Sequence, residues 1–557
     1  MERALWGLKP AGYHWVNLLL HAANALLVWR LLKRLSVPGA WLAAAIFALH
    51  PVQVESVAWI TERKNVLSLL FCLLTLLAWI EFVEDRPKPS RQFYLLALIF
   101  YALALFSKAT ACTLPAALLL ILWLKGRPIN RFRLAQLVPF LALGAGMGLL
   151  AMWWERYHQG TEGRFFSLGL PERILIVSHA IWFYAGKLVW PVNLTFSYPQ
   201  WTINPADPFA YGWLVAGAGL CGAIYYARRF TGRSVEVAAL FYVVTLSPLL
   251  GFIMLYTFCY SFVADHCQYV ASIGPIALAA GGITTALGFL GKQKSFLKPA
   301  LCGALLLTLG VLTWRQSGMY ADLETLWRTT IARNPNSYLA HESLSGVLLR
   351  KGQVEEALAH LRKALELHPD YAEAHYNFGV ALDLKGQVDE AMAQFQKALE
   401  IQPDYLKAGN NLGNVFLEKG QVDEAIIQFR KALKIQPDNP KVCNNLGMAL
   451  AQKGSADEAI VQFRKVLEIQ PNDAEAHYNI GVVHAQQGRL DEAIVQFRKV
   501  LTIQPDHANA HYNLGSALAQ KGLVDEAIAQ FKETLRFKPD DPDAKERLRA
   551  FGVPVPE

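Results

Sequence analysis

The ionisable residues best placed for chemistry lie in a short polar stretch, residues 50–64, at the end of a long apolar run. Pro51 interrupts the helix there, so the chain is expected to turn at this point. Glu55 and Arg63 could form a structural salt bridge or hold a charged head group between them. Glu55 is also the carboxylate best placed to act as a general base. We therefore predict that the residues 50–64 form part of a site.

Two more polar positions lie at the ends of apolar runs. Lys108 separates two such runs, where its ammonium group suits a phosphate but equally suits snorkelling to the membrane surface. Asp265 and His266 lie in a short loop before another apolar run. The seven cysteines show no metal or redox spacing, and no metal-binding residues are predicted. The predicted site has Glu55 as its catalytic residue and these substrate-binding residues: His50, Arg63, Lys108, Asp265 and His266.

The elements that must position these residues are membrane helices. Residues 1–315 contain ten apolar stretches of about 17–25 residues, which is the length of a membrane span. This half has 26 Lys and Arg against 12 Asp and Glu, and its positive charge lies in loops between the apolar runs. We therefore attribute the charge to membrane topology and predict no nucleic-acid partner. The predicted spans are 13–32, 39–59, 64–83, 92–108, 109–124, 134–154, 210–227, 234–256, 269–290 and 296–315.

The basic clusters follow every odd-numbered span, so they are predicted to be cytoplasmic. The loops near residues 50–64, 155–209 and 257–268 are then predicted to lie outside, together with the C-terminal half of the chain. We expect an integral protein of a bacterial inner membrane. The same alternation places residues 1–12 outside. Either this short tail is translocated with the first helix, or a preceding helix and loop are missing from this reading frame, and we favour the second explanation.

The first span has a polar stripe. Its polar residues are spaced three, four and three apart, which places them on one helical face. Hydrogen bonds between helices and the wall of a substrate cavity are both possible roles. The residues of the stripe are His14, Asn17, His21 and Asn24.

The C-terminal half repeats every 34 residues, which is the tetratricopeptide (TPR) period. Six units are predicted over residues 338–540, each with Gly, Ala and Pro at fixed offsets, and each predicts two antiparallel helices. Residues 316–337 form a junction with a half repeat, and residues 541–557 form a cap and tail. The predicted fold is therefore all-α, with a polytopic membrane bundle followed by a TPR solenoid.

An asparagine recurs at the same position in five repeats. This position tends to face the concave groove of a TPR array, where amides can hydrogen-bond a peptide backbone, although Asn is also common there for structural reasons. We predict a peptide-binding ladder of Asn377, Asn411, Asn445, Asn479 and Asn513.

Several segments together resemble the TPR-containing transmembrane O-mannosyltransferase-like family and its bacterial relatives. The matching segments are residues 12–24, 50–63, 193–199, 265–274 and 326–335. Such proteins are similar to GT-C glycosyltransferases, which take a sugar from a polyprenyl-phosphate carrier at the outer membrane face. The resemblance implies roles for Glu55, Arg63 and Lys108 around the lipid phosphate or the acceptor, and a structural or substrate role for the Asp265 loop. It also allows a divalent metal, whose ligands the sequence does not identify.

The sequence departs from this family in two places. The acidic pair that GT-C enzymes carry in their first outer loop has no counterpart here, and the family's Asp-Arg-Tyr-like triplet reads Asp265-His266-Cys267. Both put catalysis by this polypeptide in question. The leading hypothesis is a membrane protein-glycosylation factor whose partners are a polyprenyl-phosphate-linked sugar, an acceptor polypeptide in the TPR groove and the bilayer. The alternative is a non-catalytic TPR scaffold anchored in the membrane for envelope protein assembly, and a transporter comes third.

Overall fold

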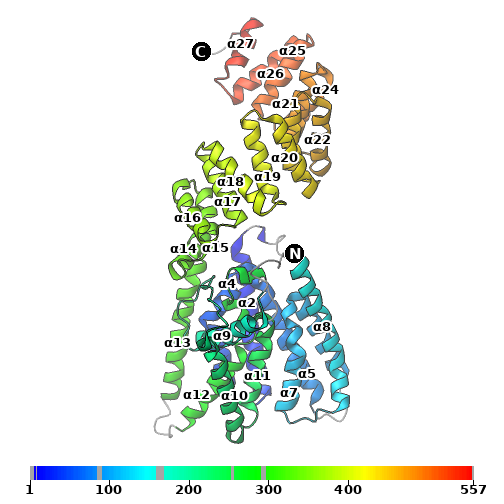
Figure 1. Ribbon diagram of the computed structural model, residues 1–557. Coiled ribbons are helices and arrows are strands. Elements are labelled where there is room, and N and C mark those ends of the chain that lie inside the picture. Colours follow the sequence, from blue (N-terminus) through cyan, green and yellow to red (C-terminus); the bar gives the residue numbers. More distant parts are fainter. Residues whose placement is uncertain are drawn as a thin grey trace. The chain divides into compact units, whose positions relative to one another are not determined.

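The computed structural model describes residues 6–7, 9–84, 91–158, 168–251, 256–289 and 297–554. The chain divides into two compact units, residues 1–344 and 345–557. All regular elements in the described residues are helices, which confirms the predicted all-α fold of a membrane bundle followed by a TPR solenoid (Figure 1). Some of the basic residues that follow the third and ninth predicted spans lie outside the described residues. These are Arg86, Lys88, Lys292 and Lys294.

The first unit is a bundle of long apolar helices. Among the described residues, five helices are long and apolar enough to cross a membrane, or six if the bent pair Ala40–Leu49 and Pro51–Ala58 counts as one span. Four shorter apolar helices accompany them. The bounds are α2 (Pro10–Arg34), α3 (Ala40–Leu49), α4 (Val54–Ala58), α5 (Arg63–Val83), α6 (Arg91–Ser107), α7 (Leu114–Leu124), α8 (Arg131–His158), α9 (Leu170–Val189), α10 (Gly212–Thr231), α11 (Ser234–Leu246), α12 (Ile273–Gly288), α13 (Leu297–Ser317) and α14 (Leu323–Arg333).

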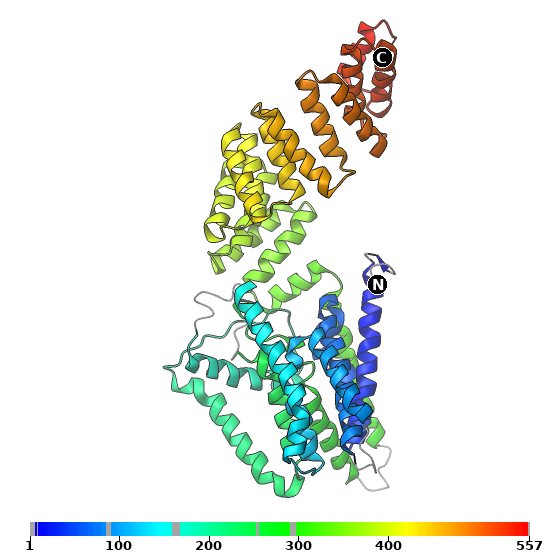
Figure 2. The ribbon, with the colours of Figure 1, turned by 90° about the vertical axis from the view of Figure 1, so that its right-hand side faces the viewer.

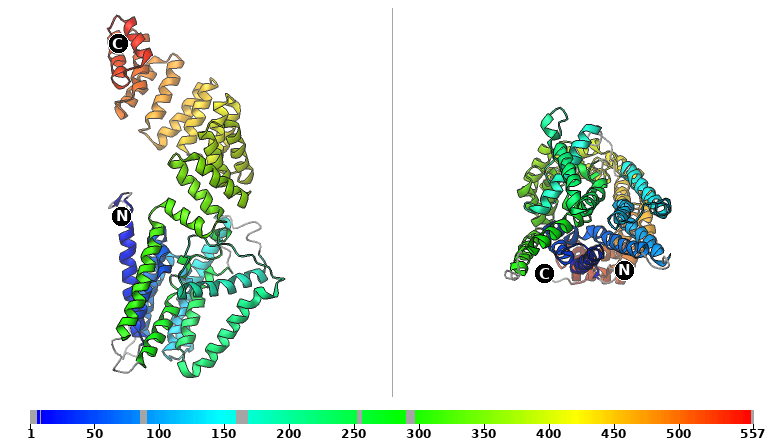
Figure 3. Two further views of the ribbon diagram at one scale, coloured as in Figure 1. Left: turned by 90° about the vertical axis from the view of Figure 1, so that its left-hand side faces the viewer. Right: turned by 90° about the horizontal axis from the view of Figure 1, so that it is seen from below.

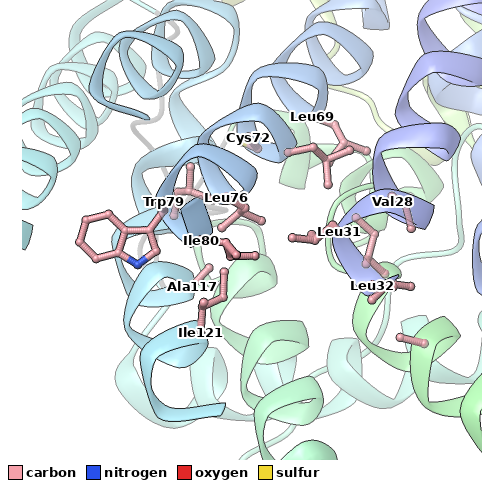
Figure 4. Packing of buried hydrophobic residues seen from close by; sticks show 14 of the residues in the cluster. Val28, Leu31, Leu32, Leu69, Cys72, Leu76, Trp79, Ile80, Ala117 and Ile121 are labelled. Carbon is pink, nitrogen blue, oxygen red and sulfur yellow. The ribbon is translucent and has the colours of Figure 1, made fainter. Parts of the chain in front are cut away.

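Helix α5 lies at the centre of the bundle. In its apolar stretch 67% of the residues are buried, against none in that of α10. Leu69, Leu76 and Ile80 of α5 pack between residues of α2 and α7 (Figure 4). Burying such side chains contributes about 1.5–3 kcal/mol each in water. Inside a bilayer their close packing holds the helices together instead.

Ion pairs join three helix ends at one end of the bundle. Arg34, at the end of α2, contacts Glu81 and lies 3.6 Å from Glu84. Lys125, just after α7, lies 3.3 Å from the same Glu84. The ends of the first, third and fifth predicted spans therefore meet at one end of the bundle, as the alternation of basic loops requires.

The polar stretch at residues 50–64 forms a broken helix. Pro51 begins a short 3-10 helix, Pro51–Gln53, and the chain bends by 55° between α3 and the segment that ends with α4. A second 3-10 helix, Ile60–Glu62, leads into α5. Helix α9 runs across the bundle at a steep angle to α10 (Figures 2 and 3). The outer loop predicted near residues 155–209 therefore contains a helix of 20 residues.

The second unit is a stack of antiparallel helix pairs. A glycine with positive φ turns the chain within each pair, for example Gly420 at 72°. The proline after each pair ends the second helix. The bounds are α15 (Tyr338–Arg350), α16 (Val354–Leu367), α17 (Ala372–Leu384), α18 (Val388–Ile401), α19 (Leu406–Glu418), α20 (Val422–Ile435), α21 (Pro440–Gln452), α22 (Ala456–Ile469), α23 (Ala474–Gln486), α24 (Leu490–Ile503), α25 (Ala508–Gln520), α26 (Val524–Phe537) and the cap α27 (Pro542–Ala550).

Candidate functional site

A cavity of about 890 Å³ lies at the end of the bundle opposite the Glu84 ion pairs, where α4, the α6–α7 connection and the loop before α12 meet. Its polar walls come from three basic and two acidic side chains. The rest of the wall is largely aromatic and small apolar residues. The charged residues that line it are Glu55, Lys64, Lys108, Glu155 and His266.

Glu55 and His266 form the acidic part of this site. The Glu55 side chain is buried, and its Oε1 lies 3.0 Å from Nδ1 of His266. Its Oε2 accepts a hydrogen bond of 2.9 Å from the backbone N–H of His266. Burial alone lowers the pKa of the His266 imidazole, but Cys267 and Glu55 outweigh it and hold this pKa well above its ordinary value. Glu55 is therefore fixed at the cavity wall beside a cationic ring.

Asp265 is held behind this pair. Its two carboxyl oxygens each lie 3.0 Å from the hydroxyl of Tyr198, which donates to them. Burial, followed by the negative charge of Glu55, raises the pKa of Asp265 to about 8. Asp265 does not line the cavity described above, so the structure places it as a support of the loop that carries His266.

The raised pKa of Asp265 predicts a pH-dependent stability. Because the folded chain holds this proton more tightly than the unfolded chain, the contribution is complete below pH about 4 and is lost as pH rises through about 8. We expect the melting temperature of the detergent-solubilised chain to fall across this range. For each pH unit in this range, Asp265 changes the free energy of unfolding by at most about 1.4 kcal/mol. The Asp265→Asn variant should lose this slope, and Asp207→Asn, in the segment before α10, should keep it. Equal slopes in the two variants would contradict the assignment.

Lys108 belongs to a buried cluster that the sequence did not predict. Glu62 is 1% exposed, and its carboxylate lies 3.0 Å from Nζ of Lys64 and 3.9 Å from Nζ of Lys108. Asn65 donates to Glu62 over 2.5 Å and to the carbonyl oxygen of His266 over 3.2 Å, and accepts from Lys108. The cluster thus holds two ammonium groups at the cavity and joins them to the His266 loop. The signal in the sequence was the Glu62-Arg63-Lys64 triplet, in which only the arginine was assigned to the site.

Arg63 and His50 make contacts to neighbouring helices. Arg63 donates to Asn17 over 2.8 Å and to the carbonyl oxygen of Tyr13 over 3.0 Å, both on α2. His50 lies 3.0 Å from the carbonyl oxygen of Leu188 through Nε2, and its Nδ1 accepts from the backbone N–H of Val52. Both residues hold the broken helix in place. Neither lines the 890 Å³ cavity.

The polar stripe of the first span hydrogen-bonds neighbouring helices. Asn17 donates to the carbonyl oxygen of Val57, and Asn24 donates to that of Val66. His21 lies 2.7 Å from the hydroxyl of Tyr269. These bonds favour the structural role, while His14 and His21 also line a separate apolar cavity of about 430 Å³.

Within the described residues, no group of three His, Cys, Asp or Glu side chains is arranged to hold a metal ion. The side chains around the cavity pair with one another instead, as Glu55 does with His266 and Glu62 with Lys64. These residues do not fit the divalent metal that the resemblance allows, and no step is assigned to one.

The asparagine ladder of the TPR unit connects adjacent repeats. Asn445 donates to Asn410 and Asn414 of the preceding repeat over 2.9 and 3.0 Å. Asn479 donates to Asn444 over 3.1 Å, and Asn513 donates to the Tyr478 hydroxyl over 2.9 Å. Asn411 bonds Tyr376 in the same way, and Asn377 lies at the equivalent position of α17. A bound peptide would have to share or displace these amide bonds.

Comparison with known proteins agrees with this two-part structure. The family described as dolichyl-phosphate-mannose-protein mannosyltransferase matches residues 4–154. Tetratricopeptide repeat families match residues 315–366, 347–405, 413–454, 447–488, 483–522 and 508–541. The human protein O-mannosyl-transferase TMTC1 is 24% identical over 417 residues, which cover 66% of this chain and 47% of that protein.

The predicted resemblance to the TPR-containing transmembrane O-mannosyltransferase-like family is confirmed. The Caenorhabditis elegans protein O-mannosyl-transferase F38B6.6 of this family is 25% identical, covering 65% of this chain and 51% of that protein. Mouse TMTC2 is 42% identical over 93 residues, which cover 16% of this chain and 11% of that protein. The chain spans about half the length of the longer-matching relatives. This chain is a membrane protein with TPR repeats.

Among solved structures, that of YrrB, a TPR protein with an unusual peptide-binding site, is 30% identical. It covers 35% of this chain and 98% of its own, with a TM-score of 0.30.

Proposed function

We propose that this chain is a membrane protein-glycosylation factor that transfers a mannosyl group from a polyprenyl-phosphate carrier to a polypeptide. The observation that carries the proposal is the cavity, where a carboxylate, Glu55, and two lysines, Lys64 and Lys108, line one space. Relatives named protein O-mannosyl-transferases support the same class of function.

The two lysines suit the carrier phosphate. A phosphodiester buried at the edge of a membrane needs at least one paired cation, because an isolated charge is costly there. Lys108 is 16% exposed and Lys64 is 52% exposed at the side chain, so Lys108 holds the deeper position. Glu62 fixes both ammonium groups when the site is empty, and its single charge leaves the pair with a net positive charge for the phosphate.

Glu55 suits the role of general base. In the proposed step, the acceptor hydroxyl oxygen forms a bond to C1 of the sugar while the bond from C1 to the phosphate oxygen breaks. Glu55 accepts the hydroxyl proton, and the electron pair of the broken bond leaves on the phosphate, beside Lys108. The cationic His266 at 3.0 Å orients Glu55 and keeps it in place.

The TPR arm would bind the acceptor polypeptide on the extracytoplasmic side of a bacterial inner membrane. The meeting of Arg34 and Lys125, which follow the first and fifth predicted spans, at one end of the bundle supports this orientation, since the cavity lies at the other end. The Asn ladder would bind the peptide backbone through the amide groups that Asn411, Asn445 and Asn479 already use between repeats.

Removing the Lys108 ammonium should weaken carrier binding. We expect Lys108→Gln to reduce the affinity of the purified chain for a short-chain polyprenyl-phosphate mannose about 10- to 100-fold, the worth of a charge-assisted hydrogen bond. The measurement is a titration in detergent, followed by microscale thermophoresis.

Lys125→Gln is the matched control. Lys125 is 20% exposed and lies 3.3 Å from Glu84, so it is a half-buried, paired lysine like Lys108, but it lies at the other end of the bundle. Its removal should leave binding unchanged. A wild-type chain that binds no polyprenyl-phosphate mannose would contradict the proposed function and favour the scaffold hypothesis.

A further inference from the structure

The segment Asn193–Tyr198 forms one wall of the site without belonging to a helix. Phe196 and Ser197 line the cavity, and Tyr198 donates to Asp265. Asn193 begins the segment with a φ of 54°, a left-handed conformation that Asn tolerates better than most residues. Side-chain contacts from neighbouring elements therefore determine where this wall lies.

Those contacts come from α14, the helix at the junction with the repeats. Asn334, directly after α14, is 4% exposed and donates to the carbonyl oxygen of Ser197 over 3.1 Å. Arg333 donates to the carbonyl oxygen of Leu194 and, over 3.1 Å, to Gln316 Oε1. Gln316 in turn donates to the same Leu194 oxygen over 3.2 Å. The backbone of the wall is thus held at two carbonyl groups.

Aromatic contacts continue from α14 to the acidic part of the site. Trp327 of α14 meets Phe196 edge to face, with ring centroids 5.1 Å apart. Phe196 meets Trp59 at 4.9 Å, and Trp59 meets His266 at 5.9 Å. Such ring pairs are directional, so a shift of Trp327 moves the preferred position of Phe196.

Phe196 is partly exposed at the cavity, whereas the neighbouring Ser197 side chain is buried. Its hydroxyl oxygen is buried and has no hydrogen-bond partner among the described residues. The face of the Phe196 phenyl ring suits the C–H groups that one face of a sugar ring presents.

We propose that Asn334 and Trp327 are positioning residues that set Phe196 against the sugar ring of the lipid-linked donor. This inference rests on the proposed function and names the part of the donor that the wall contacts. Because residues 334–337 alone separate α14 from the first helix of the repeats, the sugar-binding wall and the repeat array are joined by a short segment of chain.

The test compares two ligands that differ only in the sugar. Asn334→Ala should weaken binding of short-chain polyprenyl-phosphate mannose about three- to tenfold, in line with one lost hydrogen bond, and leave binding of sugar-free polyprenyl phosphate unchanged. Trp327→Leu should act in the same direction. Lys108→Gln, in contrast, should weaken both ligands equally. A merely structural role would weaken both ligands or neither, and either result for Asn334→Ala would overturn the proposal.

Two control variants and a hydrogen-exchange measurement without ligand complete the test. Asn204→Ala removes an exposed amide in the same outer loop, and Trp314→Leu removes an indole that is 76% exposed on α13, so both should bind like the wild type. Hydrogen exchange of the peptide 193–200 should become faster in Asn334→Ala and stay unchanged in Asn204→Ala. Unchanged exchange in Asn334→Ala would overturn the positioning role even if the wild type bound no sugar lipid, which is the separate failure of the proposed function.

Discussion

Replacing Glu55 with Gln is expected to reduce mannosyl transfer to a Ser/Thr peptide by about 100-fold or more, the usual contribution of a general base. The amide keeps the shape of the side chain, and its oxygen can still accept the backbone N–H of His266, which now lies 2.9 Å from Oε2. It cannot accept the proton of the acceptor hydroxyl. Binding of polyprenyl-phosphate mannose should therefore stay within a few-fold of the wild type. Transfer is measured as radiolabelled mannose incorporated into the peptide under single-turnover conditions.

Glu155→Gln is the control for this prediction. Glu155 lines the same cavity and accepts the backbone N–H of Tyr256 over 3.3 Å, so the substitution removes the same charge from the same space. It should leave the rate within a few-fold of the wild type. Equal losses in the two variants would mean that cavity charge matters and Glu55 is not the base. Full activity of Glu55→Gln would assign the reaction to another carboxylate.

The sequence predicted the fold because both units repeat simple patterns. Apolar length and basic loops indicated the spans, and the 34-residue period indicated the helix pairs. Helix α9 was missed because its residues, Leu170–Val189, lie between two spans and were assigned to a loop. Its first turn contains Pro171, the second residue of the helix after the N-cap Gly169, and this helix-start signal was available in the sequence.

The candidate site was only partly predictable. Glu55, His266 and Lys108 could be identified as polar residues at span ends, and the structure brings all three to one cavity. Their partners could not be identified, because Glu55 contacts a residue 211 positions away and Lys108 one 43 positions away. Sequence patterns report neighbours on one element, whereas these contacts depend on how separate helices pack.

The ladder shows the same limit in the repeats. The 34-residue spacing identified equivalent asparagines, but not that they donate to the preceding repeat, as Asn445, Asn479 and Asn513 do. That contact depends on the rotation between successive helix pairs, which the period alone does not specify.

The second large effect is expected in the repeats, where Gly413→Ala should destabilise the array. A methyl group on Gly413 would lie 2.5 Å from Cε1 and 2.7 Å from Cζ of Phe429, which is 0% exposed and packs between the helices of its repeat. Since the ring has no free space to move into, α19 and α20 must separate. We expect a loss of about 1–3 kcal/mol in the free energy of unfolding, typical of overpacking. Urea unfolding of the full chain in detergent, followed by far-UV circular dichroism, measures this loss. The free energy of unfolding is expected to fall by about 1–3 kcal/mol for each molar of urea.

Gly409→Ala on the same helix separates packing from helix propensity. A methyl group there has as its nearest neighbour the Ala432 Cβ at 3.9 Å, an ordinary contact. Because alanine favours a helix over glycine by about 1 kcal/mol, this variant should be as stable as the wild type or slightly more stable. Hydrogen exchange should show faster opening of α19 and α20 in Gly413→Ala alone. If both variants unfolded at the wild-type urea concentration, the close approach of α19 to Phe429 would not hold the repeat together, and its stability would have to come from the contacts between repeats, such as Asn445 to Asn410.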